Sequence, residues 1–152
     1  MEILDNLRET IQRELNNLEL VVGWEQGYDP LHGTPIFIRS PEDADRLIWS
    51  PLCGHNLASY LPGLKGRKVG ILVKGCDSRS VIQLLQEGLI SRDEIVIFGI
   101  PCRGVVDLTK IKARLNVARI KEISFDDNAI VVETDQQREE TCPKTVVRYI
   151  PA

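Results

Sequence analysis

Residues 71–88, "ILVKGCDSRSVIQLLQEG", decide the fold, because an apolar run passes through a short turn into an amphipathic helical pattern. The run "RKVGILVKG", which leads into the turn, is continuous and rich in β-branched residues, as is typical of a strand buried on both faces. Gly88 closes the helical pattern. The sequence therefore predicts a strand, a tight turn that carries Cys76, and a helix.

The same design returns further along the chain in "EIVIFGIPCRGVVDLTKIKARL", where Cys102 again follows an apolar strand. Asp107 is placed to cap the helix that comes next. Strand, helix, strand and helix in this order indicate a right-handed crossover and a parallel sheet. We therefore expect an α/β fold whose small, mostly parallel sheet has helices on both faces.

The flanking segments complete one predicted α/β domain over residues 1–152. An apolar stripe at helical spacing predicts an amphipathic helix within residues 1–19. The α/β core then spans residues 20–116, with a Ser40-Pro41 helix start on the way. Residues 117–152 read as a C-terminal β-hairpin around an Asp-Asp-Asn turn, followed by a polar tail.

The totals exclude several classes of function. The chain has 152 residues, 43% of them hydrophobic and 27% charged, which is ordinary for one globular domain. The net charge is −3 and the basic residues are scattered, so no nucleic-acid partner is expected. No apolar run is long enough to span a membrane, and the acidic start does not resemble a signal peptide. We expect a cytoplasmic protein, and a homo-oligomer stays open.

The four cysteines are the main functional signal, at positions Cys53, Cys76, Cys102 and Cys142. In a reducing compartment such a set indicates metal or redox chemistry more often than structural disulfides. The chain has no C-x-x-C pair, so local spacing alone supports no zinc or ferredoxin motif. Because ligands bind at the carboxyl ends of parallel strands, Cys76 and Cys102 should face one crevice. Their expected separation suits two ligands of one metal centre and also lies close to disulfide range.

The turns that carry these cysteines suit an anionic group. Each opens a helix, where free N–H groups and the helix dipole favour a phosphate, a thiolate or an anionic cluster. Gly75 and Gly104 allow a bulky group to approach the backbone. Cysteines from four separate loops could close a [4Fe-4S] site. Three alternatives stay open: a zinc site, cysteines that are only small buried hydrophobes, and Asp77 and Arg79 as a mere helix cap and a solvated charge.

The stretch "VGILVKGCDSRSVIQLLQEGLISRDEIVIFGIPCRGVVD" resembles the β-subunit family of coenzyme F420 hydrogenases and dehydrogenases. The resemblance rests on a K-G-C-D-x-R turn, an L-x-E segment before the next strand and a G-x-P-C-x-G turn. The segment "PEDADRLIWSPLCGHNLASYL" is similar to the family's C-x-x-N-L segment. The resemblance covers roughly residues 20–107.

Members of this family are iron–sulfur flavoproteins of hydrogenase, formate dehydrogenase and heterodisulfide reductase type complexes. The resemblance implies that Cys53, Cys76 and Cys102 ligate a cluster, with Cys142 as a further, looser match. It implies a cofactor-binding turn at Gly75, Asp77 and Arg79. Many relatives carry ferredoxin-type C-x-x-C-x-x-C segments, which this chain lacks. Many are also longer than this chain. The resemblance thus implies a partial subunit whose ferredoxin and catalytic parts lie on partner proteins.

The leading hypothesis is therefore an electron-transfer subunit of an anaerobic oxidoreductase complex. It would bind one [4Fe-4S] cluster through Cys53, Cys76 and Cys102, with Cys142 as the looser fourth match. It would also bind FAD or FMN through residues in and beside the two turns, namely Lys74, Gly75, Asp77, Ser78, Arg79 and Gly104. One rival is a metal-free domain that grips a flavin or nucleotide on the Gly75–Arg79 turn. Another is an interaction domain stabilised by zinc.

Overall fold

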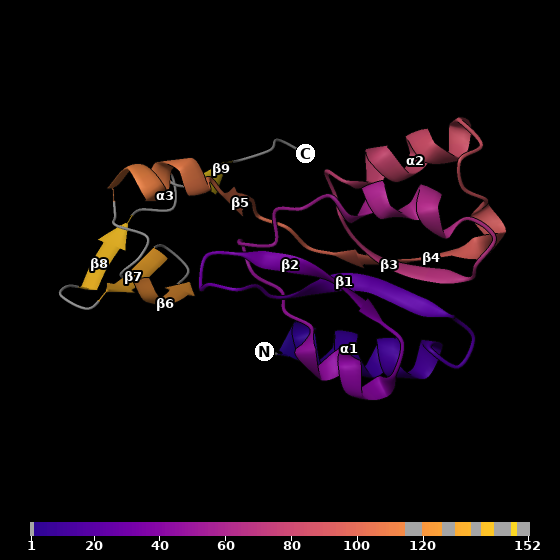
Figure 1. The fold of residues 1–152 in the computed structure, drawn as a ribbon, viewed down its shortest axis with the longest axis horizontal. Helices are drawn as coiled ribbons and strands as arrows, with labels where there is room; N and C mark the ends of the chain where they lie inside the picture. The colour runs from indigo at the N-terminus through magenta and orange to yellow at the C-terminus, as the bar shows by residue number, and fades with distance from the viewer. Residues whose placement is uncertain (1, 115–119, 126–129, 135–137, 142–146, 149–152) are drawn as a thin grey trace.

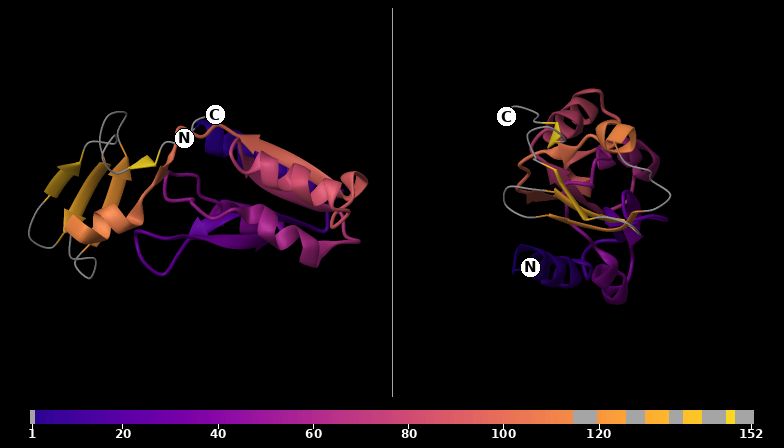
Figure 2. Two further views of the ribbon diagram at one scale, coloured as in Figure 1. Left: turned by 90° about the horizontal axis from the view of Figure 1, so that it is seen from above. Right: turned by 90° about the vertical axis from the view of Figure 1, so that its left-hand side faces the viewer.

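The protein is described here by a computed structural model, which describes residues 2–114, 120–125, 130–134, 138–141 and 147–148. The longer part is a four-stranded sheet with helices on both faces (Figure 1). The shorter part, formed by the C-terminal elements, lies beyond one end of this sheet, so the molecule is elongated (Figure 2). The predicted α/β class, with its N-terminal helix and C-terminal hairpin, is confirmed.

The main sheet has the strand order β2-β1-β3-β4. Strand β1 (Leu20–Gln26) pairs antiparallel with β2 (Gly33–Ile38), as a hairpin, and parallel with β3 (Val69–Lys74). Strand β3 pairs parallel with β4 (Ile95–Ile100), in a register that sets Lys74 opposite Ile100. The sheet is thus mostly parallel, and β1 and β3 form its centre.

Helices cover the two faces of the sheet. Helix α1 (Glu2–Glu14) and the 3-10 helix η1 (Pro41–Arg46) lie on one face, whereas α2 (Ser78–Gln86) and η2 (Leu57–Leu64) lie on the other (Figure 1). A short 3-10 turn, η3 (Arg92–Glu94), leads into β4. One core cluster runs through all these layers, with the fully buried strand β3 at its middle. The strand "VGILVK" is apolar throughout because both of its faces are covered.

Local signals set the helix boundaries. Ser40 caps η1 in a capping box, since its hydroxyl accepts the Asp43 N–H and the Asp43 carboxylate accepts the Ser40 N–H. Gly88, at φ 68°, ends the α2 segment as predicted. The predicted helix from Pro41 to about Trp49 is shorter, because Leu47 is extended and its N–H bonds back to Ala44.

Strand β4 differs from its prediction as a strand buried on both faces. Only Ile95, Phe98 and Ile100 are buried, whereas Val96 and Ile97 are 37% and 43% exposed. The cause is position, since in the part of the chain that the structure describes β4 pairs with β3 alone and forms an edge of the sheet. An apolar run cannot by itself distinguish a central strand from an edge strand.

The C-terminal part builds a second, smaller core. Helix α3 (Leu108–Arg114) follows β5 (Val105–Val106) and begins after Asp107, whose carboxylate accepts the Thr109 N–H as predicted for a cap. The predicted hairpin is β6 (Ile120–Phe125) with β7 (Ile130–Thr134), to which the structure adds β8 (Arg138–Thr141). Strand β9 (Val147–Arg148) pairs with β5. The cluster also includes Leu31, from the loop between β1 and β2.

Candidate functional site

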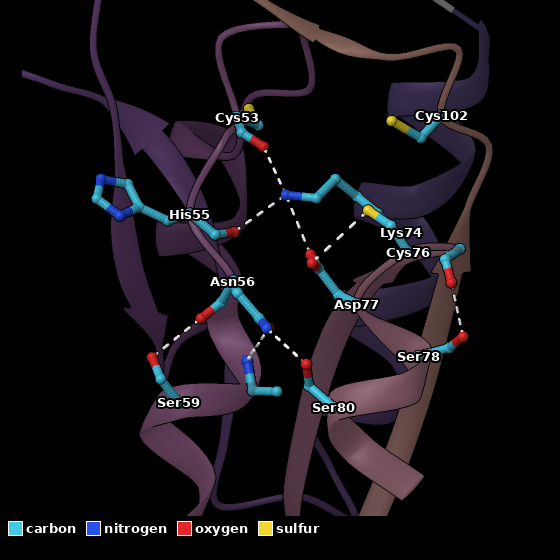
Figure 3. Close-up of polar contacts among 12 residues, drawn as sticks. Cys53, His55, Asn56, Ser59, Lys74, Cys76, Asp77, Ser78, Ser80 and Cys102 are labelled. Atoms are coloured by element: carbon cyan, nitrogen blue, oxygen red, sulfur yellow. Dashed lines mark hydrogen bonds and ion pairs between the residues drawn. The ribbon is translucent and has the colours of Figure 1, made fainter. Parts of the chain in front are cut away.

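The register of β3 and β4 brings Cys76 and Cys102 to the same end of the sheet. Lys74 and Ile100 are paired and end their strands, and each cysteine follows two residues later. The chain turns at once after β3, where the Asp77 N–H bonds to the Lys74 carbonyl, and α2 begins at Ser78. The two parallel strands therefore place both thiols at the same end of the sheet (Figure 3).

Cys53 reaches the same end of the sheet from the loop between η1 and η2. Its thiol is fully buried, approaches the Ile48 carbonyl at 3.9 Å, and packs against Gly33. The Cys102 side chain lies in the same region as Cys53 and Cys76 (Figure 3). Figure 3 shows the three sulfur atoms around the side chain of Lys74. The three described cysteines are free thiols that gather in one region.

The gathered thiols do not form a ready-made metal site. Within the described ranges, no three His, Cys, Asp or Glu side chains lie close enough together to hold a metal ion. Cys142, the fourth predicted ligand, lies outside the described residues. The donor chemistry nevertheless fits an iron–sulfur cluster, because thiolates from separate loops are its usual ligands. The predicted ligand set stays a prediction.

Burial and charge keep two of these thiols protonated. Burial raises the pKa of the Cys53 thiol above its ordinary value, and the nearby Lys74 ammonium offsets only part of this effect. The pKa of the Cys76 thiol is also raised, first by burial and then by the adjacent Asp77 carboxylate. A free thiol in either position is thus a weaker nucleophile than a helix N-terminus alone would produce.

Lys74 occupies the middle of this region, and sequence reasoning did not anticipate its burial. Its side chain is 1% exposed, and its ammonium donates to the carbonyls of Cys53 at 2.8 Å and His55 at 3.1 Å. The ammonium also pairs with the Asp77 carboxylate at 3.0 Å and lies 4.9 Å from the centroid of the Trp24 ring. A charged group is tolerated in a core only when it is paired and hydrogen-bonded in this way.

This network ties two of the thiol-bearing segments together, the loop of Cys53 and the turn of Cys76. Lys74 ends β3 two residues before Cys76, its bonds hold the loop of Cys53 and His55, and Asp77 opens α2. The Asp77 side chain makes no capping bond to α2, because it is turned toward Lys74 instead. The alternative that Asp77 is only a helix cap is therefore wrong. The predicted role of Lys74 in cofactor binding is untested, but its ammonium is already engaged by protein oxygens.

The rest of the predicted turn is accessible. The Ser78 hydroxyl donates to the Gly75 carbonyl at 2.6 Å and thereby stabilises the turn. Gly75 is exposed, and no atom lies within 4 Å of the position that a Cβ would take there. Arg79 is exposed on the first turn of α2. Gly104 adopts φ 140°, a conformation that favours glycine. These positions are open to a ligand from outside, as a cofactor-binding turn requires.

A groove of about 400 Å³ adjoins this turn, between η2 and α2. Most of its lining residues are polar, but most of its lining surface is apolar; the residues are Asn56, Ala58, Ser59, Arg79, Ser80, Gln83 and Leu84. The Asn56 amide bridges the two helices by donating to the Ser80 hydroxyl at 2.8 Å, while its oxygen caps η2 (Figure 3). Sequence reasoning missed Asn56 and Ser80, since only the packing of η2 against α2 brings them together.

Neither histidine joins the cysteines. The His55 imidazole is turned away from them, and only its backbone carbonyl takes part in the Lys74 network (Figure 3). His32 pairs with Asp29 at 2.6 Å in the loop between β1 and β2, where it stacks on Tyr28. From the sequence, His55 could be a ligand but is more often incidental, and His32 carries no usable signal; both interpretations stay predictions.

Comparison with known proteins adds two likenesses. The chain is 30% identical, over 91 residues, to the β subunit of F420-dependent formate dehydrogenase 1 of Methanococcus maripaludis. That match covers 57% of this chain and 23% of that subunit. No family model matches the chain.

The second likeness is in structure. The chain resembles a chain of the F420-reducing [NiFe] hydrogenase complex from Methanosarcina barkeri, with a TM-score of 0.64 and 13% identity. The match covers 93% of this chain and 56% of that one, so this chain spans only part of the length of either relative. At this identity the structural likeness concerns the fold. Together the two findings confirm that the chain resembles the coenzyme F420 hydrogenase and dehydrogenase β-subunit family.

Proposed function

We propose that the chain is an electron-transfer subunit of an F420-dependent hydrogenase or formate dehydrogenase type complex. The observation that carries the proposal is the gathering of Cys53, Cys76 and Cys102 around one end of the main sheet. The names of the two similar proteins supply the class of complex. This chain spans only part of those proteins, and we propose that it exchanges electrons with partner redox subunits.

The group assigned to the three thiols is a [4Fe-4S] cluster, with Cys142 as the fourth ligand. Such a cluster supplies one-electron transfer when it is bound. The residues of the chain do the rest: Lys74 fixes the loop of Cys53 against β3, and Asp77 keeps that ammonium paired. The α2 N-terminus adds positive potential, which favours an anionic cluster, whereas the Lys74 charge is already paired with Asp77. Zinc on the same thiols remains the alternative metal.

A flavin is the second group assigned to the chain, as FAD or FMN. The observation that favours it is the groove of about 400 Å³ beside the open turn at Gly75, with Arg79 in its lining. An exposed guanidinium at the start of a helix suits a phosphate, which would pair with Arg79. The apolar part of the groove, formed by Ala58 and Leu84, suits contact with a ring system.

Spectroscopy of anaerobically reconstituted protein tests these assignments. Cys76→Ser and Cys102→Ser should each abolish the reduced-cluster signal in electron paramagnetic resonance while keeping the flavin. Arg79→Ala should weaken flavin binding while keeping the iron. A wild-type protein that binds flavin but never iron would overturn the electron-transfer assignment and favour a metal-free flavin-binding domain. Zinc without iron would favour the interaction domain.

A further inference from the structure

Strand β4 presents an unprotected edge of the main sheet. Within the described residues it pairs only with β3, and its sequence, "IVIFGI", contains neither a charge nor a proline. The opposite edge is different, because β2 carries Pro35. Figure 2 shows the orange β4 along one long side of the sheet. Folded proteins block such edges against unwanted pairing, so an unblocked apolar edge indicates a partner strand.

The side chains of this edge also leave room for a partner. Val96 and Ile97 are 37% and 43% exposed, although both are large and apolar. No atom lies within 4 Å of the position that a Cβ would take on Gly99. On the other face of β4, a groove of about 320 Å³ separates the strand from α1, with Ile100 among its lining residues. The edge thus has two exposed apolar side chains, those of Val96 and Ile97, and two places with room for a partner side chain, at Gly99 and beside Ile100.

We propose that β4 pairs with β4 of a second copy of this chain, antiparallel and about a two-fold axis at Phe98. In an antiparallel ladder, opposite residues have the same hydrogen-bonding character, and this character alternates along each strand. A residue can therefore not lie opposite the copy of its sequence neighbour, which has the other character. The two-fold axis must pass between one residue and the same residue of the second copy. Pairing at Phe98 joins the two sheets into one continuous sheet across the dimer.

In this register each exposed apolar side chain lies opposite a place with room for it. Ile97 of one copy lies opposite Gly99 of the second copy, whose surroundings are open. Val96 lies opposite Ile100 of the second copy, beside the groove under α1. Each contact occurs twice, as a two-fold interface requires. The exposed apolar side chains are then covered by pairing that also satisfies free backbone groups.

The register also ends the ladder cleanly. Ile95 lies opposite Pro101 of the second copy, which has no N–H to donate. The Ile95 carbonyl does not need that donor, because it already accepts a hydrogen bond from Arg92 Nη1 at 2.9 Å. The Ile95 N–H is likewise bonded, to the Arg92 carbonyl. Regular pairing therefore stops at Ile95, whose N–H and carbonyl are both already hydrogen-bonded to Arg92.

Charge complementarity selects Phe98 over its neighbours as the axis. Asp93 and Arg103 stand five residues to either side of Phe98, just beyond the two ends of the ladder, so the two-fold axis brings each to the same end of the interface as the other's copy. Both are exposed, and neither forms an ion pair in the described part of the chain. An axis at Ile97 would leave Arg103 opposite Ser91 instead. A second copy is the occupant that supplies both charges at the right ends.

Mass measurement across a concentration series tests the proposal, on the full chain in reducing buffer. Wild type should approach twice the chain mass of 17.1 kDa as concentration rises. Ile97→Lys should keep the protein monomeric, because it places a charge in the ladder. Ile82→Lys is the matched control, since Ile82 is 53% exposed on helix α2 and not on the pairing strand, and should leave the dimer intact.

Charge exchange tests the register itself. Asp93→Arg and Arg103→Asp should each weaken self-association about tenfold, because each sets like charges opposite one another at both ends. Mixing the two variants should restore it, since a mixed dimer regains one native and one reversed ion pair. The double variant Asp93→Arg/Arg103→Asp should likewise associate as wild type does.

The proposal is overturned if wild type stays monomeric at about 0.5 mM, well above typical affinities of specific dimers. It is also overturned if Ile82→Lys dissociates the dimer as Ile97→Lys does, or if the mixed charge variants fail to associate. None of these measurements depends on bound iron or flavin, so they succeed or fail separately from the electron-transfer assignment.

Discussion

At the scale of single residues, Lys74 is the side chain on which the site depends most. Lys74→Met should lower the free energy of unfolding by about 3–5 kcal/mol, because it leaves the Asp77 carboxylate, which is 12% exposed, without its cation. The carbonyls of Cys53 and His55 lose their donor as well. Urea unfolding measures the change.

Lys65→Met is the control, since the exposed Lys65 ammonium also donates to one carbonyl, that of Gly88, at 2.7 Å. It should cost less than about 1 kcal/mol. Equal effects of the two substitutions would contradict the role assigned to the Lys74 network. In Lys74→Met/Asp77→Asn, removal of both charges should recover part of the loss, and a strictly additive double variant would argue against direct coupling.

The Cys53 thiol adds a pH dependence to stability. Because burial raises its pKa in the folded state, the folded protein holds this proton more tightly than the unfolded chain does. The contribution is fully present below the unfolded value of 9.0 and is lost as pH rises through the folded pKa. The urea concentration at the unfolding midpoint should therefore decrease as the pH is raised from 8 to 10. Cys53→Ala should reduce this slope, and an unchanged slope would show that Cys53 is not its source.

At the scale of elements, the close packing of β3 against its neighbours leaves no room at Gly70. A Cβ there would lie 2.7 Å from the Phe98 ring and 2.9 Å from a methyl of Val21. Gly70→Ala should destabilise the protein by about 1–3 kcal/mol, because both neighbours would have to move. Gly63→Ala is the control, since nothing lies within 4 Å of that position. Thermal unfolding of the pair checks the prediction, and a Gly70→Ala midpoint no lower than that of Gly63→Ala would refute it.

The elements of the α/β core were predictable from the sequence for a physical reason. Strand β3 is central and apolar throughout, and Ser40, Gly88 and Asp107 set boundaries through bonds or φ values that few other residues provide. What the sequence did not predict depends on packing between distant segments. The exposed side of β4 and the pairing of β5 with β9 belong to this class.

For the site, too, local sequence predicted some features, whereas others depend on packing between distant segments. Parallel strands made the proximity of Cys76 and Cys102 predictable, because register fixes where strands end. The burial of Lys74 was not predictable, since it depends on the loop of Cys53 and His55 folding over the end of β3. A lysine before a turn resembles a solvent-exposed cation in sequence alone. Only its three oxygen partners and the Trp24 ring distinguish it.

At the scale of the whole molecule, two cores share one connecting loop. Leu31, in the loop between β1 and β2, is fully buried in the second cluster with Ile111 and Ile130. Leu31→Ala should cost about 2–5 kcal/mol and should speed hydrogen exchange in β6 and β7 more than in β3. Ile3→Ala, at a side chain that is 57% exposed, is the control. Equal loss of protection in both parts would show that they unfold as one unit.

The central claim concerns the whole molecule as an electron carrier. The measurement that tests it most directly is iron and acid-labile sulfide per chain, on protein purified and reconstituted without oxygen. The proposed cluster predicts about four of each, with a broad visible absorbance that dithionite bleaches. Protein that holds no iron and no sulfide after reconstitution would contradict the claim.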